Sequence, residues 1–139
     1  AGRAEGATAV LGGGRVRNET GGFYIEPTIF DGVKNDMKIA QEEIFGPVLS
    51  AITVNGFDEA MEVANDTIYG LAGAVWTGSV KNAHRAAKAM RAGVVWVNCF
   101  DRGSMAVPFG GFKQSGFGRD KSLHAMDKYT DFKAIWFAH

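Results

Sequence analysis

Three short apolar segments recur at a regular spacing in the middle of the chain, and this repeat restricts the fold more than any other feature. They begin at positions 48, 71 and 94 and span residues 48–54, 71–77 and 94–98. They are nearly apolar throughout and rich in β-branched or aromatic residues, which is typical of strands covered on both faces. Because helical patterns fill the intervals between them, the repeat predicts an α/β layer fold with right-handed crossovers.

Both intervening helices have recognisable start signals. Asp58 is placed to cap a helix over residues 59–65, and Ser79 to cap a helix over residues 80–91. The apolar positions of the second helix fall on one stripe, and Gly93 is expected to end it.

The segments before this repeat are shorter and richer in glycine. Residues 7–11 and 23–30 are predicted to be extended, with a polar, glycine-rich stretch between them. Asp36 is then expected to cap a short helix that reaches Ile44 and is broken by the following Gly-Pro pair.

After the repeat, a long loop over residues 99–118 exceeds what a simple connection needs, and such loops are usually functional. A helix is predicted over residues 119–129, with Leu123 and Met126 facing inward. Residues 132–138 are apolar and β-prone. A free apolar strand is prone to aggregation unless its edge is paired, so we expect this one to join a sheet from another chain or from missing sequence.

Composition narrows the class of protein. The chain has 139 residues and no net charge, with 15 basic and 15 acidic side chains, so it suits one folded domain and offers no electrostatic footprint for nucleic acid or an anionic membrane. No apolar run is long enough to span a membrane. The single cysteine, Cys99, cannot form an internal disulfide, so we expect a cytoplasmic location. The missing initial Met suggests a piece of a longer chain.

The glycine-rich stretch over residues 108–119 does not fit a known phosphate-binding motif. Gly111 and Gly116 have the spacing of a P-loop, but the Lys and Ser or Thr that must follow are absent. A dinucleotide fingerprint is equally incomplete, since Gly116 and Gly118 supply only two of its three glycines. From the pattern alone, these glycines are better explained as a surface loop that folds back on itself.

Other candidate sites are weaker still. The three histidines have no metal-ligand spacing, so no metal site is predicted. Cys99 follows a strand but has no base nearby in the sequence, and a buried, inert thiol is the preferred interpretation. Glu42 and Glu43 lie beside Phe45, a combination that could hold a ribose and a flat ring. Two solvated glutamates beside a core Phe would explain the same pattern.

Taken together, the motifs resemble those of the NAD(P)-dependent aldehyde dehydrogenase superfamily, and they occur in its order. Four carry the likeness, and residues 22–30 also fit it. They are Glu42-Glu43-Ile44-Phe45-Gly46-Pro47-Val48, Asn65-Asp66-Thr67-Ile68-Tyr69-Gly70-Leu71, Gly93-Val94-Val95-Trp96-Val97-Asn98 and Pro108-Phe109-Gly110-Gly111-Phe112-Lys113-Gln114-Ser115-Gly116-Phe117-Gly118-Arg119-Asp120.

The resemblance implies a fold and a division of the chain. Residues 1–130 resemble the C-terminal part of a three-layer, parallel-sheet catalytic domain, and residues 131–139 a strand that pairs with an oligomerisation sheet. Family members are several times longer, and they oxidise aldehydes to acids with NAD or NADP through a cysteine thiohemiacetal. The Gly-Gln-x-Cys context of their nucleophile is absent here. We therefore expect no catalytic residue in this segment, and no activity of the isolated chain.

The resemblance also implies supporting roles for five residues. Glu43 matches the residue that holds the nicotinamide ribose, with Phe45 beside it. Phe100, Asp101 and Phe109 match the loop that lines the aldehyde tunnel.

Four further positions inform the expected substrate and assembly. Gly103 replaces an aromatic residue of many relatives and Arg102 lies beside Asp101, which together imply a wider, more polar tunnel. The tail is most similar to the branch acting on γ-glutamyl-γ-aminobutyraldehyde and related amino-aldehydes. Arg119 and Asp131 are expected to help hold the terminal strand of a homo-oligomer.

Two other hypotheses stay open on the sequence. One is a catalytically silent interaction module that associates through residues 132–138. The other is an unrelated flavodoxin-like ligand-binding domain.

Overall fold

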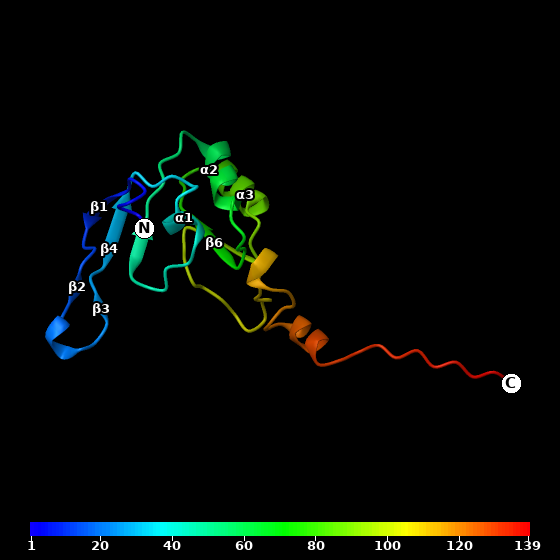
Figure 1. The fold of residues 1–139 in the computed structure, drawn as a ribbon. Helices are drawn as coiled ribbons and strands as arrows, with labels where there is room; N and C mark the ends of the chain where they lie inside the picture. Colours follow the sequence, from blue (N-terminus) through cyan, green and yellow to red (C-terminus); the bar gives the residue numbers. More distant parts are fainter. The chain divides into compact units, whose positions relative to one another are not determined.

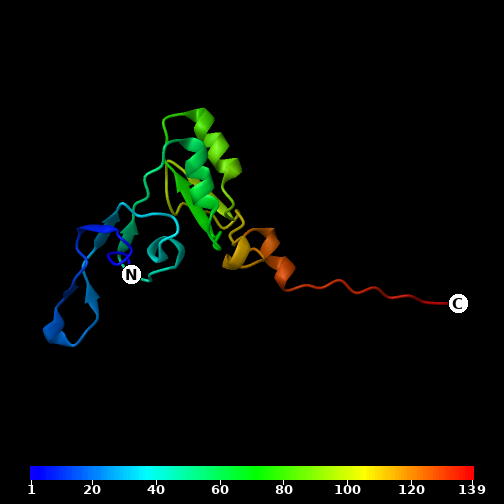
Figure 2. The ribbon, with the colours of Figure 1, turned by 45° about the horizontal axis from the view of Figure 1, so that its top comes forward.

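The computed structural model describes all residues, 1–139, as two compact units, Ala1–Asp66 (unit 1) and Thr67–His139 (unit 2). Figure 1 shows the elements of both, and Figure 2 shows the same ribbon turned by 45°. Each unit combines strands with helices, so the predicted α/β class is confirmed.

Unit 1 contains a three-stranded sheet in the order β1-β4-β5. β1 (Thr8–Leu11) runs antiparallel to β4 (Thr28–Asp31), and β5 (Val48–Ser50) runs parallel to it. A two-stranded antiparallel ribbon, β2 (Arg15–Val16) with β3 (Tyr24–Ile25), extends from this sheet. It is closed by a short 3-10 turn, η1 (Asn18–Thr20), at the tip of the blue loop in Figure 1.

The two helices of unit 1 begin differently from the prediction. α1 (Lys38–Gln41) is capped by extended Met37 without a side-chain bond, so Asp36 is not its cap. α2 (Phe57–Asn65) has Gly56 at its cap position, and Asp58 lies in the first turn, where a carboxylate suits the helix dipole. The Glu59 carboxylate, in the first turn, reaches back and accepts the Asn55 backbone N–H at 2.6 Å, just before the cap.

A small apolar core holds unit 1 together. Ala7, Val33 and Met37 are buried and contact one another. Four half-buried side chains pack around them: Phe30, Ile39, Ala40 and Ile52. This core joins the start of β1 to the turn before α1, so it sets where α1 begins.

Unit 2 contains the β-α-β arrangement that the regular spacing predicts. β6 (Ala72–Val75) and β7 (Val94–Val97) pair in parallel, and α3 (Val80–Ala89) connects them. The Ser79 hydroxyl accepts the Asn82 backbone N–H at 3.3 Å, which confirms the predicted cap. The helix ends two residues earlier than expected, because Met90 is already extended.

The three predicted strands do not form one continuous ladder. β5 hydrogen-bonds to β4, whereas β6 pairs with β7 in a separate sheet. After β5, the backbone N–H of Ala51 donates to the Phe30 carbonyl at 2.8 Å, and the Ala51 carbonyl accepts the Val33 N–H at 3.2 Å. These bonds hold the end of β5 against the end of β4 and the turn that follows it.

The C-terminal region of unit 2 departs most from the prediction. In place of a helix over residues 119–129 there is a shorter 3-10 helix, η3 (Leu123–Lys128). Lys121 and Ser122 have φ values of 58° and 50°, which prevents an α-helix from starting earlier. Leu123 is 88% exposed and Met126 59% exposed, so the expectation that both face inward is wrong.

Residues 132–138 form no strand within this chain and run as a single extended segment, red in Figure 1. The aromatic side chains of Phe132, Trp136 and Phe137 are almost fully exposed. Pairing of this segment with another sheet stays a prediction. No helix of either unit has both the length and the apolar character to cross a bilayer.

Candidate cofactor and substrate sites

The segment that follows α1 forms the first candidate site, which we call the glutamate hollow. It has a volume of about 340 Å³. It is lined by Ile39, Glu42, Glu43, Ile44, Phe45, Gly46, Val48, Leu49 and Ser50. The two residues expected to contact a nicotinamide ribose, Glu43 and Phe45, are therefore brought together.

Backbone geometry presents these two side chains to solvent. α1 ends at Gln41, short of the expected Ile44, because Glu42 is already extended, and Phe45 has a φ of 53° and is 89% exposed. The alternative of a core Phe beside the glutamates is therefore wrong in this structure. The following turn is held by the Pro47 carbonyl, which accepts the Thr28 N–H at 2.8 Å and so ties the turn to β4.

A side-chain network fixes the end of α1. The Gln41 amide NH₂ lies 2.7 Å from the Asn35 carbonyl oxygen and 3.0 Å from that of Asp66, within hydrogen-bond distance of both. The Asn35 amide in turn donates to the Asp66 carboxylate at 2.5 Å. Gln41 thus joins the turn before α1 to the end of α2, two residues ahead of Glu43.

Chemically, the glutamate hollow offers carboxylate acceptors beside an exposed aromatic face. A carboxylate can accept both hydroxyls of a ribose, and an aromatic ring can contact a flat ring system. Glu42 is held by an exposed ion pair with Lys38 at 3.4 Å, whereas no ion pair engages Glu43. Glu43 is therefore the carboxylate that a diol can engage without first breaking an ion pair.

The second candidate site lies in unit 2 and is called the loop hollow here. Its volume is about 310 Å³, and one wall is the loop that follows β7. It is lined by Val94, Trp96, Asp101, Arg102, Gly103, Ser104, Met105, Val107, Pro108, Phe109 and Lys121. Asp101 and Phe109 are thus brought together as expected.

Phe100, the third expected tunnel residue, does not line the loop hollow. Its ring lies 5.0 Å from that of Trp96, centroid to centroid, at an interplanar angle of 54°. It therefore packs against a residue of the wall. Trp96 and Lys121 line the hollow without having been predicted, because their contribution depends on contacts between distant segments.

The start of this loop is held tightly to both strands. The Asn98 side chain accepts the Thr77 N–H at 2.8 Å and donates to the Thr77 carbonyl at 3.0 Å, which joins the ends of β6 and β7. The Trp96 indole N–H donates to the Arg102 carbonyl at 2.7 Å. Asn98 and Asp101 have φ values of 52° and 53°, so the chain turns sharply at both positions.

The far end of the loop closes on itself. Phe109 and Asp120 exchange two backbone hydrogen bonds, at 2.8 and 2.6 Å, and the Met105 carbonyl accepts the Ser122 N–H at 2.7 Å. An ion pair between Asp120 and Lys128 joins this bridge to η3. These contacts place Phe109 and Lys121 on the same hollow.

Two features of the glycine-rich stretch explain its composition. A Cβ on Gly110 would lie 2.5 Å from the Gly118 carbonyl oxygen, so only glycine allows this approach. Gly118 has a φ of 80°, in the left-handed region that favours glycine. Next to it, the 3-10 turn η2 (Lys113–Ser115) docks through the Ser115 hydroxyl, which accepts the Gly70 N–H at 3.0 Å. The glycines thus serve loop closure, as the pattern alone suggested.

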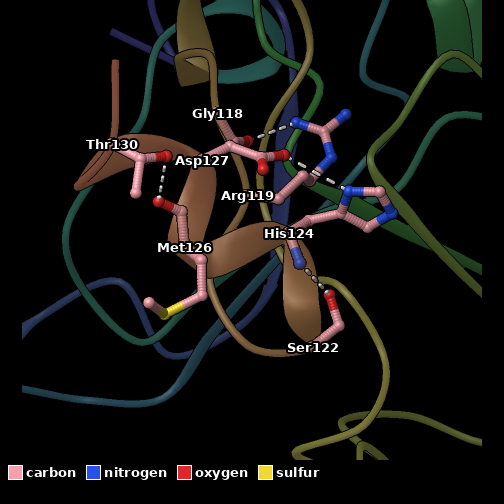
Figure 3. A network of polar contacts seen from close by, with 7 residues as sticks. All are labelled: Gly118, Arg119, Ser122, His124, Met126, Asp127 and Thr130. Carbon is pink, nitrogen blue, oxygen red and sulfur yellow. Dashed lines mark hydrogen bonds and ion pairs between the residues drawn. The ribbon is translucent and has the colours of Figure 1, made fainter. Parts of the chain in front are cut away.

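Ser122, His124 and Asp127 gather the residue types of a hydrolase triad without its geometry (Figure 3). His124 Nδ1 lies 3.4 Å from the Asp127 carboxylate, but the Ser122 hydroxyl accepts the backbone N–H of His124 at 3.3 Å. The serine therefore caps η3 and has no imidazole base.

Arg119 lies beside this network but binds its own loop. The guanidinium donates to the carbonyl of Gly118 at 2.6 Å (Figure 3). It also donates to the Gly111 carbonyl at 3.1 Å and lies over the Phe112 ring at 5.2 Å. Asp131 accepts the neighbouring Phe132 N–H at 2.8 Å. The expectation that Arg119 holds the terminal strand is thus not met within this chain, because the loop carbonyls take its hydrogen bonds.

Possible metal ligands and the single cysteine form no reactive cluster in this structure. No group of three or more His, Cys, Asp or Glu side chains is arranged to hold a metal. Cys99 is a free, half-buried thiol and does not line the loop hollow.

Comparison with known proteins decides the family. The model of the aldehyde dehydrogenase family matches residues 1–135, nearly the whole chain. The chain belongs to the aldehyde dehydrogenase family. The resemblance inferred from the four motifs is thereby confirmed.

Individual relatives support this assignment at both the sequence and the structure level. Aminoacetaldehyde dehydrogenase of Pseudomonas aeruginosa is 52% identical over 116 residues, which are 83% of this chain and 23% of that protein. A crystal structure of indole-3-acetaldehyde dehydrogenase with NAD⁺ is 63% identical, with a TM-score of 0.92 over 99% of this chain and 28% of that one. A γ-glutamyl-γ-aminobutyraldehyde dehydrogenase from Burkholderia cenocepacia is 61% identical, with a TM-score of 0.88 over 94% and 26%.

These comparisons also set the scale of the segment. The chain spans 23 to 28% of the length of the curated relatives it matches.

Proposed function

We propose that this segment is part of an enzyme that oxidises aldehydes to carboxylic acids with NAD⁺ or NADP⁺. The family match over residues 1–135 carries the proposal. Solved relatives in complex with NAD⁺ support the choice of cofactor. The two hollows are the places where this chain's own residues would contribute.

In this proposal the segment supplies the C-terminal part of the catalytic domain, residues 1–130, followed by an oligomerisation strand, residues 131–139. The order of the four motifs supports this placement. In the complete enzyme the strands would belong to a three-layer, mainly parallel sheet, and the product would be a homo-oligomer. The single free cysteine suits a cytoplasmic location.

The glutamate hollow is proposed to hold the nicotinamide ribose. Glu43 would accept the ribose hydroxyls, and Phe45 would contact the adjoining ring, a fit supported by the exposure of both side chains. When bound, the nicotinamide supplies the hydride acceptor. Holding its ribose matters because hydride transfer requires near-contact geometry, so orientation contributes directly to the rate.

The loop hollow is proposed to hold the aldehyde. Phe109 supplies an apolar wall, Phe100 supports that wall through Trp96, and Asp101 places a carboxylate at its edge. A carboxylate there would suit an amino-aldehyde, and relatives named for aminoacetaldehyde and γ-glutamyl-γ-aminobutyraldehyde support that class. We place the nucleophilic cysteine and the general base outside this segment, so the chain by itself is expected to produce no NADH.

The test is Glu43→Gln in the full-length enzyme that carries this segment. The variant keeps the shape of the side chain but removes its charge, so the KM for NAD⁺ is expected to rise about tenfold, in line with the loss of charge-assisted hydrogen bonds. Steady-state kinetics with a saturating aldehyde measures this.

Glu42→Gln is the matched control, because Glu42 is the neighbouring glutamate and is held by the exposed pair with Lys38. An equal rise in both variants would contradict the assignment of Glu43. Steady NADH formation by the isolated chain would contradict the placement of the nucleophile.

A further inference from the structure

We propose that Lys121, together with Arg102, makes the loop hollow a carboxylate-binding subsite. The enzyme would then favour aldehydes whose far end carries a carboxylate. The inference deepens the proposed function and rests on it, because it names the substrate class that the loop hollow selects.

The position of Lys121 is set by the fold of the loop. Its backbone φ of 58° is not helical, so the residue stays outside η3, and it is half-buried. The ammonium lies 5.3 Å from the centroid of the Phe109 ring. It also lies 3.7 Å from the point where a Cβ on Gly103 would be. The charge is therefore held between the aromatic wall and the loop backbone.

Gly103 makes this position available. A Cβ there would already touch the ammonium, and a larger side chain would compete with it for space. The sequence combines the smallest residue at position 103 with a long cation at position 121. The two positions together place a positive charge on the wall of the hollow.

The charges of the hollow are not neutralised within the segment. Arg102 and Lys121 contribute two cations and Asp101 one carboxylate, and the structure forms no salt bridge among them. The Lys121 ammonium contacts an aromatic face but no anionic acceptor. A substrate carboxylate would supply the missing acceptor and form charge-assisted hydrogen bonds.

Within the proposed class of amino-aldehydes, these charges favour a substrate that also carries a carboxylate over a simple amino-aldehyde. An ammonium group on the substrate would meet Asp101 but also two like charges. A substrate with both a carboxylate and an amino group would satisfy all three side chains. The shared requirement is the carboxylate, and that is the chemistry we assign to Lys121.

The experiment compares three aldehydes of equal chain length on the full-length enzyme: 4-oxobutanoate, 4-aminobutanal and butanal. Lys121→Met removes the charge while keeping an unbranched apolar side chain. We expect kcat/KM for 4-oxobutanoate to fall about tenfold, that for 4-aminobutanal to rise, and that for butanal to stay within twofold. Lys121→Arg should keep the preference of the wild type.

Lys81→Met, an exposed lysine on α3, is the control for loss of a surface charge. Equal losses for all three aldehydes would overturn the proposal. A wild type that prefers 4-aminobutanal and is unaffected by Lys121→Met would also overturn it, and would assign selectivity to Asp101.

A binding measurement separates this inference from the proposed function. Calorimetric titration with succinate and with the neutral butanamide requires no turnover, and succinate is expected to bind at least tenfold more weakly to Lys121→Met while butanamide is unchanged. If no aldehyde is oxidised but succinate binding still depends on Lys121, the proposed function fails and the subsite stands. If aldehydes are oxidised and succinate binds both forms equally, the subsite fails alone.

Discussion

At the scale of single residues, the two hollows coincide with backbone that non-glycine residues rarely adopt. Phe45 lies in the glutamate hollow, Asp101 and Lys121 line the loop hollow, and Asn98 and Ser122 flank it, all with φ between 50° and 58°. Such conformations cost about 1–3 kcal/mol each and persist only where neighbours enforce them. One such enforcing contact is the pair of hydrogen bonds between Asn98 and Thr77. The backbone turn at Asn98 is therefore held by contacts within the chain itself.

Gly93→Ala should destabilise the full-length enzyme. Its new Cβ would overlap the Gly110 carbonyl oxygen, so the glycine-rich loop must shift away from the start of β7. Overpacking of this kind costs about 1–3 kcal/mol. Chemical denaturation measures the free energy of unfolding. Gly78→Ala is the control, since a Cβ there meets nothing within 4 Å, and similar losses in both variants would show that the close approach is unimportant.

At the scale of elements, both hollows depend on how a short element ends. α1 is a single turn, too short to be stable alone, and its end is tied by Gln41 to Asn35 and Asp66. The loop after β7 is likewise closed by the bridge between Phe109 and Asp120. In each case a few long-range hydrogen bonds hold the backbone segment that carries the candidate site residues.

Gln41→Ala should weaken cofactor binding without touching the cofactor. The change removes the hydrogen bonds that fix the end of α1, each worth about 1 kcal/mol, so Glu43 becomes less well oriented. We expect the KM for NAD⁺ to rise about threefold to tenfold, with the KM for the aldehyde unchanged. Lys38→Ala, which removes an exposed ion pair from the same helix, should leave both within twofold. A change in the aldehyde KM alone would argue against this positioning role.

At the scale of the whole molecule, little apolar surface is buried. Only Ala7, Val33, Met37 and Ala86 are buried hydrophobic residues, while Phe23, Phe117 and the terminal aromatics are exposed. Exposed apolar surface of this extent marks interaction sites. With a chain that spans about a quarter of its relatives' length, this supports our proposal that other polypeptide segments cover it in the complete enzyme.

Deleting residues 132–139 should change the association state of the full-length enzyme. The segment exposes an apolar strand-like edge, and pairing it with a sheet of a second subunit would satisfy its backbone and cover its side chains. Light scattering is expected to show a smaller particle for the deletion variant. Equal masses for both forms would contradict the strand-pairing proposal and, with it, the alternative of an interaction module that uses the same segment.

Elements with local signals could be predicted from the amino-acid sequence. The spacing of apolar residues, the β-branched residues and the cap signal predict β6, α3 and β7. Ser79 can be identified as a cap because its hydrogen bond reaches only three residues along the chain. The four motifs identify the family because their residues and their order can be recognised without a structure. The same resemblance predicts site roles for Glu43, Phe45, Asp101 and Phe109, and the structure brings these residues to the two hollows.

Features that depend on contacts between distant segments emerged only from the three-dimensional structure. It divided the predicted strands between two sheets, because β5 pairs with β4, a strand twenty residues earlier in register. It replaced a predicted helix with η3, because the bridge from Asp120 to Phe109 holds the preceding backbone. It brought Lys121 to the Phe109 ring beside Gly103. Local patterns report local free-energy preferences, whereas these outcomes depend on which backbone groups meet in space.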